Sequence, residues 1–333
     1  MNGKIFGMIM LAVLVAGTAL LALRFQPTGL ATLPEEGYTV KIGYKPNANY
    51  VVLFVALEKG YFEDEGLKVE TLKFDSTNTI MDAFAAGHLD ATPTGNVVVS
   101  YSLENTRPGL FKLFSPDFYT DERHSENLIV RKGSGIRSIN NLEGKTIGAN
   151  KGIFARTMIR KFLEKQGVID FKIIEIDDSL QLQALETGQI DALVSLEPNP
   201  TIAVEKGIAE YLVNGSVYAK TFGFYPSTSC GVISTKFLHE HPAEAKKFLQ
   251  AMKRSIEFIT KNFEESKQIL PKYIPIEKNI AEKTTFPEFQ YVDSMSKEQK
   301  EAIQKTADFL FEEGIIKKKV DTSRLMLDEK DLE

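Results

Sequence analysis

Side chains that could hold a small solute gather at the ends of short apolar runs of the sequence. Each run has the alternation or the branched side chains of a β-strand, and polar, aromatic or glycine residues follow it. Lysine ammonium groups and helix N-termini suit an anionic oxygen, whereas a glutamate and aromatic rings suit an amino-bearing heterocycle. These residues predict non-covalent binding and leave the charge of the solute open. The candidate ligand-binding residues are Lys45, Asn47, Asn49, Tyr50, Thr94, Gly95, Asn96, Ser115, Lys151, Gly152, Phe154, Ser195 and Glu197.

Glu197 is the strongest single candidate in this set. It stands just after the apolar run 192–194, and a carboxylate at the exit of such a run needs a partner. Gly95 and Gly152 lack side chains, so a ligand can approach the backbone closely there. The hydroxyl and amide side chains of the set also suit helix N-caps, and its lysines also suit solvated positions.

The sequence carries no signature of a catalytic, metal or cofactor site. It has no GxSxG, Walker A, GxGxxG or HExxH pattern. Its single cysteine, Cys230, excludes an internal disulfide and any multi-cysteine metal site. The net charge is -5 and the basic residues are interspersed with acidic ones, unlike the surface of a nucleic-acid binder. We therefore predict no catalytic residue, no metal, no cofactor and no nucleic-acid partner.

A duplicated unit is expected to position the candidate residues. One copy covers 40–96 and the other 146–198, and in each the strand-like and helical segments alternate. Both copies contain nearly the same phrase, AGHLDA at 86–91 and TGQIDA at 187–192. Strands that alternate with helices indicate mostly parallel sheets, in which ligands sit at the carboxyl ends of the strands. The sequence therefore predicts two similar α/β lobes that face each other across a cleft.

The repeat also predicts how the chain is divided. The stretch 132–135 is expected to carry the chain into lobe II, and 222–234 is expected to return it, which makes a hinge of two crossings. Two helical segments, 243–273 and 296–311, are expected to pack on lobe I. The predicted parts are an N-terminal segment, 1–37, then lobe I, 38–133 with 222–333, and lobe II, 134–221.

The N-terminal segment is apolar enough to enter a bilayer. Residues 5–23 carry no charge and lie between Lys4 and Arg24, and a run of about 18 such residues is a candidate membrane span. Its length favours a retained anchor over a cleaved signal peptide, whose apolar region is usually about 7 to 15 residues. A tether with prolines and glycines, 25–37, follows it. With either outcome the body is expected to be exported.

Four phrases of the sequence resemble a known family. They lie at 56–67, 86–90, 142–148 and 188–198, and in this order they resemble the substrate-binding proteins of ABC importers of the nitrate, sulfonate, taurine and pyrimidine-precursor type. The resemblance covers nearly the whole chain after residue 38. It implies a two-lobed type II periplasmic-binding-protein fold. It also implies a monomer that closes on a small molecule, delivers it to a permease with ATPase subunits, and catalyses nothing.

Two alternatives stand beside this interpretation. The first is a thiamine-pyrimidine-synthase-like enzyme on the same fold, whose family members use their own histidine and carry a pattern of histidine and cysteine. The single cysteine and only four histidines argue against that activity here. The second is a ligand-sensing domain coupled to a membrane partner. The ligand itself, an oxyanion such as a sulfonate or a pyrimidine-like ring, is left open.

Overall fold

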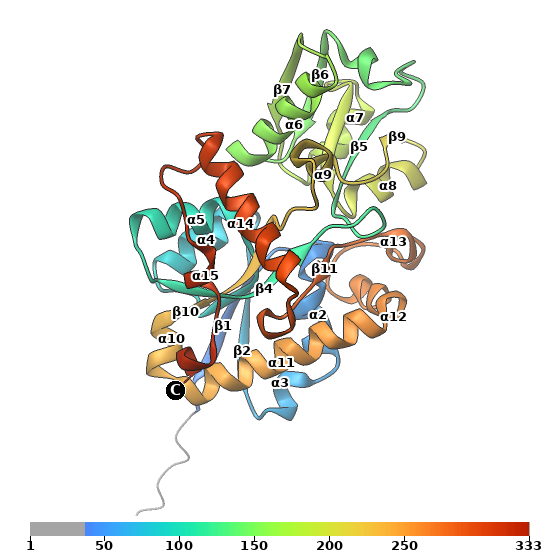
Figure 1. Ribbon diagram of the computed structural model, residues 1–333. Helices are drawn as coiled ribbons and strands as arrows, with labels where there is room; N and C mark the ends of the chain where they lie inside the picture. The colour runs from blue at the N-terminus through green and yellow to red at the C-terminus, as the bar shows by residue number, and fades with distance from the viewer. Residues whose placement is uncertain (1–36, 333) are drawn as a thin grey trace, which may run out of the picture. The chain divides into compact units, whose positions relative to one another are not determined.

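Two β-sheets organise residues 37–332, the part of the chain that the computed structural model describes (Figure 1). The first sheet is six-stranded, in the order β11-β4-β10-β3-β1-β2. Strand β1 pairs in parallel with β2 and β3, whereas β10 is antiparallel to β3 and β4. We call this sheet and its helices lobe I. Its strands are β1 (Thr39–Tyr44), β2 (Lys68–Lys73), β3 (Ala91–Asn96), β4 (Phe111–Phe118), β10 (Ser229–Ser234) and β11 (Glu288–Phe289).

The second sheet is five-stranded, in the order β7-β6-β8-β5-β9, and forms the upper part of Figure 1. Strand β6 pairs in parallel with β7 and β8, and β5 is antiparallel to β8 and β9. We call this sheet and its helices lobe II. Its strands are β5 (Glu126–Arg131), β6 (Lys145–Ala149), β7 (Phe171–Glu175), β8 (Ala192–Leu196) and β9 (Ala209–Val213).

Helices cover both sheets. Those of lobe II come between its strands, apart from α9, which follows β9, whereas lobe I carries a long C-terminal set in addition to the helices between its strands. In lobe I they are α2 (Val51–Glu58), α3 (Tyr61–Asp64), α4 (Thr77–Ala85), α5 (Val97–Thr106), α10 (Thr235–Glu240), α11 (Pro242–Lys261), α12 (Phe263–Lys267), α13 (Lys278–Lys283), α14 (Lys297–Glu312) and α15 (Thr322–Leu325). In lobe II they are α6 (Ile153–Lys165), α7 (Gln181–Glu186), α8 (Asn199–Glu205) and α9 (Val217–Phe222).

The repeat in the sequence is the shared plan of the two sheets. In lobe I, β1 lies between β2 and β3, with Ile42 opposite Ala91. In lobe II, β6 lies between β7 and β8 in the same way, with Ile147 opposite Ala192. An antiparallel strand then follows on the outer side of β3 and of β8. The prediction of two similar α/β lobes with mostly parallel central strands is confirmed.

A glycine in the first strand of each repeat explains why the same phrase recurs. A Cβ atom on Gly43 would lie 2.5 Å from Cδ1 of Leu89, and one on Gly148 would lie 2.5 Å from Cδ1 of Ile190. Leu89 and Ile190 are the apolar residues of the repeated phrase, and both are buried. In each lobe, therefore, the first strand of the repeat packs tightly against the segment that precedes its third strand.

The chain enters lobe II earlier than the sequence indicates. The strand at 126–131, which was placed in lobe I, pairs with β8 and β9 in the second sheet, so the first connection between the sheets is 119–125 rather than 132–135. Its apolar residues, 128–130, suit the interior of either sheet, so they do not indicate which sheet the strand joins. Residues 132–135 form a turn inside lobe II instead, where Lys132 N–H donates to Ile208 O. The return connection is 223–228, at the start of the predicted stretch 222–234, whose second half is β10.

The C-terminal helices fit the predicted segments with two differences. The segment predicted as 243–273 is divided at Asn262 between α11 and α12, and α11 packs on α2 and α3 of lobe I. Helix α14 matches the second prediction, 296–311, but it also reaches lobe II. The ring centroids of Phe309 and of Phe222, in α9, lie 4.4 Å apart. Glu313, just after α14, forms an ion pair with Lys161 in α6.

The predicted membrane segment 5–23 lies outside the described residues. The choice between a retained anchor and a cleaved signal is therefore still a prediction. Within residues 37–332, no helix combines the length and the apolar character that crossing a bilayer requires.

Candidate functional site

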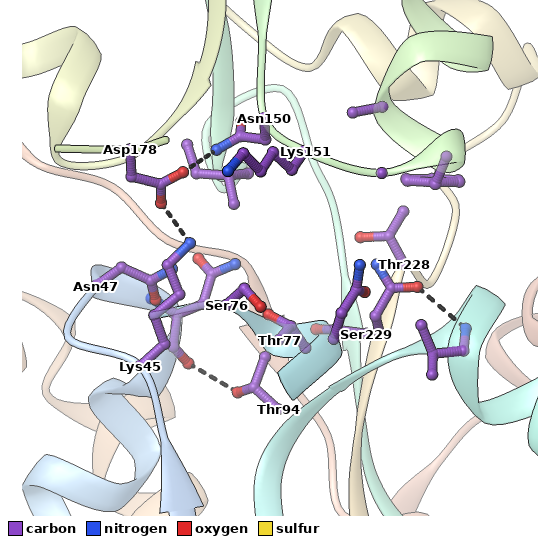
Figure 2. Close-up of a pocket in the computed structure, with 18 of the residues that line it drawn as sticks. Lys45, Asn47, Ser76, Thr77, Thr94, Asn150, Lys151, Asp178, Thr228 and Ser229 are labelled. Carbon is purple, nitrogen blue, oxygen red and sulfur yellow. Dashed lines mark hydrogen bonds and ion pairs between the residues drawn. The ribbon is translucent and has the colours of Figure 1, made fainter. Parts of the chain in front are cut away.

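A cavity of about 190 Å³ lies between the two lobes (Figure 2). A water molecule takes about 30 Å³ of liquid, so the space suits a solute a few waters in size. Its walls come from both lobes and from the two connections between them. The lining residues are Lys45, Asn47, Asn49, Tyr50, Asp75, Ser76, Thr77, Asn78, Thr94, Asn96, Val98, Val99, Tyr119, Asn150, Lys151, Gly152, Ile153, Phe154, Ala155, Ile176, Asp177, Asp178, Leu196, Tyr218, Thr228 and Ser229.

The parallel strands of both lobes deliver these residues. Strand β1 ends just before Lys45, β2 shortly before Asp75, and β6 just before Asn150. Because parallel strands present their carboxyl ends at one edge of a sheet, the segments after them converge. The two sheets face each other through these edges, as the sequence predicted.

Hydrogen bonds fix the lobe I wall internally. The hydroxyl of Tyr50 donates to Thr94 O at 2.8 Å, and the hydroxyl of Thr94 donates to Asn49 O at 3.2 Å. Asn47 caps the turn 48–50, because its Oδ1 accepts from Asn49 N–H at 3.1 Å. Burial raises the pKa of Tyr50 far above its usual range, so the hydroxyl remains a donor. These side chains shape the wall before any solute arrives.

The lobe II wall presents the start of helix α6. Gly152 is the N-cap, with φ 127°, and it offers no side-chain acceptor for the first N–H groups of the helix. Ile153 and Phe154 in this first turn line the cavity. A Cβ atom on Gly152 would lie 3.9 Å from Asn78 Nδ2 in lobe I, so the walls approach each other here. A helix N-terminus of this kind favours an anionic group.

An ion pair joins the two walls of the cavity. Lys45 Nζ of lobe I pairs with Asp178 Oδ2 of lobe II, and Asn150 Nδ2 donates to the other oxygen of Asp178 at 2.6 Å (Figure 2). A second pair, Lys151 Nζ to Asp177 Oδ1 at 2.7 Å, lies within lobe II and is about half exposed. Each lysine of the described cavity lining is therefore paired with a carboxylate. The partner of Lys45 lies on the opposite wall, and the partner of Lys151 lies on its own wall.

Within residues 37–332, two amide oxygens of the cavity lining have no hydrogen-bond partner. They are Oδ1 of Asn49 and Oδ1 of Asn150, both buried, one from each lobe. The orientation of the Asn150 amide follows from its nitrogen, which donates to the carboxylate of Asp178. Buried polar atoms normally have partners, so these two mark places where a bound solute can donate.

The floor of the cavity comes from the connections between the lobes and is missing from the sequence prediction. Thr228 and Ser229 line it, and both donate backbone N–H groups to Asp117 Oδ1 at 2.9 Å. The hydroxyl of Thr228 donates to Tyr119 Oη at 2.9 Å. Burial raises the pKa of Asp117 to about 6, while hydrogen bonds from Ser229, Thr228 and Ser227 oppose the rise.

Nine of the candidate residues line the cavity, and four do not. Gly95 lies under β10, where a Cβ atom would meet Val232 Cγ2 at 2.7 Å. Ser115 is buried inside β4. The hydroxyl of Ser195 donates to Gln181 Oε1 within lobe II. These three residues shape the sheets rather than the cavity wall.

Glu197 also points away from the cleft. Leu196 lines the cavity, and because neighbouring strand residues point to opposite faces, Glu197 faces the other side of β8. There it is 2% exposed and accepts from Asn127 Nδ2 at 2.9 Å and from Thr201 N–H at 3.4 Å. The carboxylate has the partner that its position demanded, but the partner belongs to lobe II.

Comparisons by sequence agree with the resemblance. A family model described as NMT1/THI5 like matches residues 115–266, and a model described as NMT1-like family matches residues 34–99. A putative aliphatic sulfonates-binding protein of Bacillus subtilis is 29% identical over 276 residues, which cover 81% of this chain and 80% of the relative. A 4-amino-5-hydroxymethyl-2-methylpyrimidine phosphate synthase of Saccharomyces cerevisiae is 24% identical over 66% of each chain.

Comparisons by structure agree with the fold. The alkanesulfonate-binding protein of Xanthomonas axonopodis pv. citri, solved with bound MOPS, superposes with a TM-score of 0.70 at 18% identity, over 88% of this chain and 99% of that one. The periplasmic nitrate-binding protein of Synechocystis PCC 6803 gives 0.67 at 16% identity, over 89% and 87%. The resemblance seen in the sequence is therefore confirmed: parts of the chain match NMT1/THI5-like and NMT1-like family models, and the chain shares the two-lobed fold of the solved binding proteins.

Proposed function

We propose that the protein is the extracytoplasmic solute-binding component of an ABC importer. It takes up a small molecule between its lobes and delivers it to a permease that is driven by ATPase subunits. The observation that carries the proposal is the cavity itself, which lies between the carboxyl edges of two like sheets and draws its walls from both. The similar proteins, which include sulfonate- and nitrate-binding proteins, support it.

Binding then works by a shift between open and closed forms. The lobes move about the two connections, 119–125 and 223–228, and a solute contacts both walls when they are closed. Because those contacts are complete in the closed form alone, the solute binds that form more tightly and increases its population. The permease can thereby distinguish a loaded protein from an empty one.

The nine candidate residues that line the cavity are proposed as ligand contacts or as supports of its wall. The first turn of α6 suits an oxyanion, and Tyr50 and Phe154 supply aromatic surface. A sulfonate or nitrate class of ligand and a pyrimidine-like class both fit the size of the space.

The cavity lining favours binding over chemistry. None of the described residues that line it is a histidine or a cysteine. Cys230 is 1% exposed inside β10, and burial raises the pKa of its thiol far above the usual range, so the reactive thiolate is disfavoured. A thiamine-pyrimidine-synthase-like reaction that consumes a histidine of the protein would have no such residue at this cavity wall.

A thermal-shift screen tests the proposal directly. Purified protein would be heated with sulfonates, nitrate, taurine and pyrimidine precursors, and one class is expected to raise Tm because it binds the folded state alone. Calorimetry should then give one solute per chain, with the solute recovered unchanged. Asn49→Leu, which fills part of the cavity, should abolish the shift, whereas Lys236→Met on the remote helix α10 should leave it unchanged. Turnover of any of these solutes, or the absence of any shift, would contradict the proposal.

The N-terminal segment is proposed to hold the body at the outer face of the membrane as a monomer. Membrane fractionation of the expressed full chain, with the N-terminal mass of the mature protein, tests this point. An intact segment 5–23 in the membrane fraction is expected; a shortened chain in the soluble fraction would indicate signal cleavage and a free periplasmic protein.

A further inference from the structure

We propose that Asp178 sets the charge selectivity of the cleft: as the internal counter-ion of Lys45, it makes the site select a solute that carries an amino group beside its acidic group and reject a bare oxyanion. This inference rests on the proposed function and names the class of solute that the site would take.

The first observation is the balance of charge in the cavity. Its described lining contains two lysines and no arginine, against three aspartates, so carboxylates outnumber ammonium groups. Lys45 pairs with Asp178, and Lys151 pairs with Asp177. Asp75 has no ion-pair partner within residues 37–332. Neither lysine is therefore free to receive a bare anion without competing against a carboxylate.

The second observation is the position of Lys45. Its side chain is 11% exposed, so most of its contact with water has been replaced by protein. Asp178 is held in place from behind by Asn150, whose Nδ2 donates to Oδ1 at 2.6 Å. An oxyanion that approached the Lys45 ammonium group would also approach this fixed carboxylate. Repulsion between like charges is strong where water is largely excluded, so Asp178 screens Lys45 from anions.

The third observation is the pair of unpartnered acceptors. Oδ1 of Asn49 and Oδ1 of Asn150 are buried and receive no donor from the part of the chain that the structure describes, and they come from opposite walls of the same cavity. An oxyanion has no proton to donate to either acceptor, whereas an ammonium group has three donors and a charge that the nearby carboxylates favour. These acceptors point to an amino group on the solute.

The fourth observation places the other end of the solute. The first turn of α6, at Ile153 and Phe154, lines the same cavity, and its N-cap, Gly152, provides no side-chain acceptor. Free N–H groups at a helix N-terminus suit an acidic group. The cavity is therefore dipolar, with donors at α6 and acceptors at Asn49 and Asn150.

Two sulfonates that differ by one amino group test the inference. Ethanesulfonate and 2-aminoethanesulfonate would be titrated by calorimetry into the full protein at low salt, together with inorganic sulfate. The wild type is expected to bind 2-aminoethanesulfonate at least ten-fold more tightly than ethanesulfonate. Asp178→Asn keeps the shape and frees Lys45, so it should raise the affinity for ethanesulfonate and for sulfate about ten-fold and bring the ratio of the two sulfonates toward one.

Two further variants separate a direct effect from a general change of charge. Asp170→Asn removes the same charge from an exposed position of lobe II outside the cavity lining and should change the affinities less than three-fold. Adding Lys45→Met to Asp178→Asn should cancel the gain in anion affinity. Circular dichroism and Tm confirm that each variant is folded before its titration is interpreted.

The outcomes distinguish this inference from the proposed function. If Asp178→Asn gains no affinity for ethanesulfonate or sulfate, or if Asp170→Asn gains as much, the role of Asp178 is overturned, whatever the natural solute is. If the wild type prefers ethanesulfonate over its amino analogue, the inference is equally wrong while solute binding stands. Failure of the whole solute panel with the wild type counts against the proposed function instead, and a gain in sulfate affinity by Asp178→Asn would still support the counter-ion role.

Discussion

Asp117, at the end of β4, accepts two hydrogen bonds from Ser229, the first residue of β10: one from its backbone N–H at 2.9 Å and one from its hydroxyl at 2.6 Å. A further backbone bond comes from Thr228 at 2.9 Å. The first connection between the lobes begins just after β4, and the return connection ends at β10. One buried carboxylate therefore ties the two halves of the hinge together beneath the cavity floor.

Replacing Asp117 by Asn is expected to lower the free energy of unfolding by about 1–3 kcal/mol. An amide cannot accept on both of its polar atoms, so at least one buried donor of Ser229 or Ser227 loses its partner. Urea denaturation measures the cost. Asp82→Asn, on the exposed face of α4, is the matched control and should change stability little. A loss for Asp117→Asn that equals the control would show that the carboxylate does not hold the hinge.

Glu197 predicts a dependence of stability on pH. Burial raises its pKa to about 7, against hydrogen bonds from Thr201 and Asn127 that oppose the rise. Between the unfolded pKa, about 4.5, and the folded value, the folded chain holds a proton that the unfolded chain has lost. The stabilisation is thus complete below about pH 4.5 and is lost as the pH rises through about 7, an effect on the order of 1–3 kcal/mol.

Glu197→Gln isolates this contribution. The buried Glu126, whose pKa burial also raises to about 7, gives a slope of the same sign and remains in the variant. The quantity to measure is therefore the difference in unfolding free energy between variant and wild type across pH 4.5 to 8. The unfolding free energy of the variant should rise relative to that of the wild type as the pH increases, and the difference should level off above about pH 7. A difference that does not change with pH would mean that Glu197 is ionised throughout.

Much of the cleft could be predicted from the sequence because one rule governs where it forms: ligands lie at the carboxyl ends of parallel strands. The repeat indicates which strands correspond, and polar residues at the carboxyl ends of the first and third strands of lobe I, such as Lys45 and Thr94, do line the cavity. The same rule applies to the second strands, whose exits carry Asp75 and Asp178. Those exits had the same polar signal, and applying the rule to every parallel strand would have included them.

Other parts of the site depend on how strands pair and which face they turn to the cavity, and the sequence pattern does not determine these. The apolar residues of β5, 128–130, suit the interior of either sheet, so they do not fix its partner, and the hinge at 119–125 could not be placed. The face of β8 that meets the cavity was also undetermined. A shift of one residue exchanges Leu196 for Glu197, and alternation alone does not say which of the two faces lobe I.

Gly148→Ala is expected to destabilise the protein by about 1–3 kcal/mol. The new Cβ atom would lie 2.5 Å from Ile190 Cδ1, 3.1 Å from Leu193 Cδ1 and 3.3 Å from Ile176 Cδ1, and overpacking of a buried site has costs of this size. Adding Ile190→Val removes the closest methyl group, so the double variant should recover part of the loss. Thermal unfolding of the four proteins in the cycle gives the coupling. If the two losses simply add, the contact between the strand and the repeated phrase is not the cause.

Tyr50→Phe separates a wall-building role from a ligand contact. The hydroxyl of Tyr50 is buried and already donates to Thr94 O at 2.8 Å, so its removal should cost about 1 kcal/mol of stability. Because the hydroxyl's only proton is engaged in that bond, the affinity for whichever solute gives the thermal shift should change less than three-fold. Asn49→Ala removes an acceptor that has no partner among the described residues, and it should weaken the same binding at least ten-fold. Calorimetry on both variants checks the contrast. Loss of binding in Tyr50→Phe with stability intact would move Tyr50 from the wall to the ligand contacts.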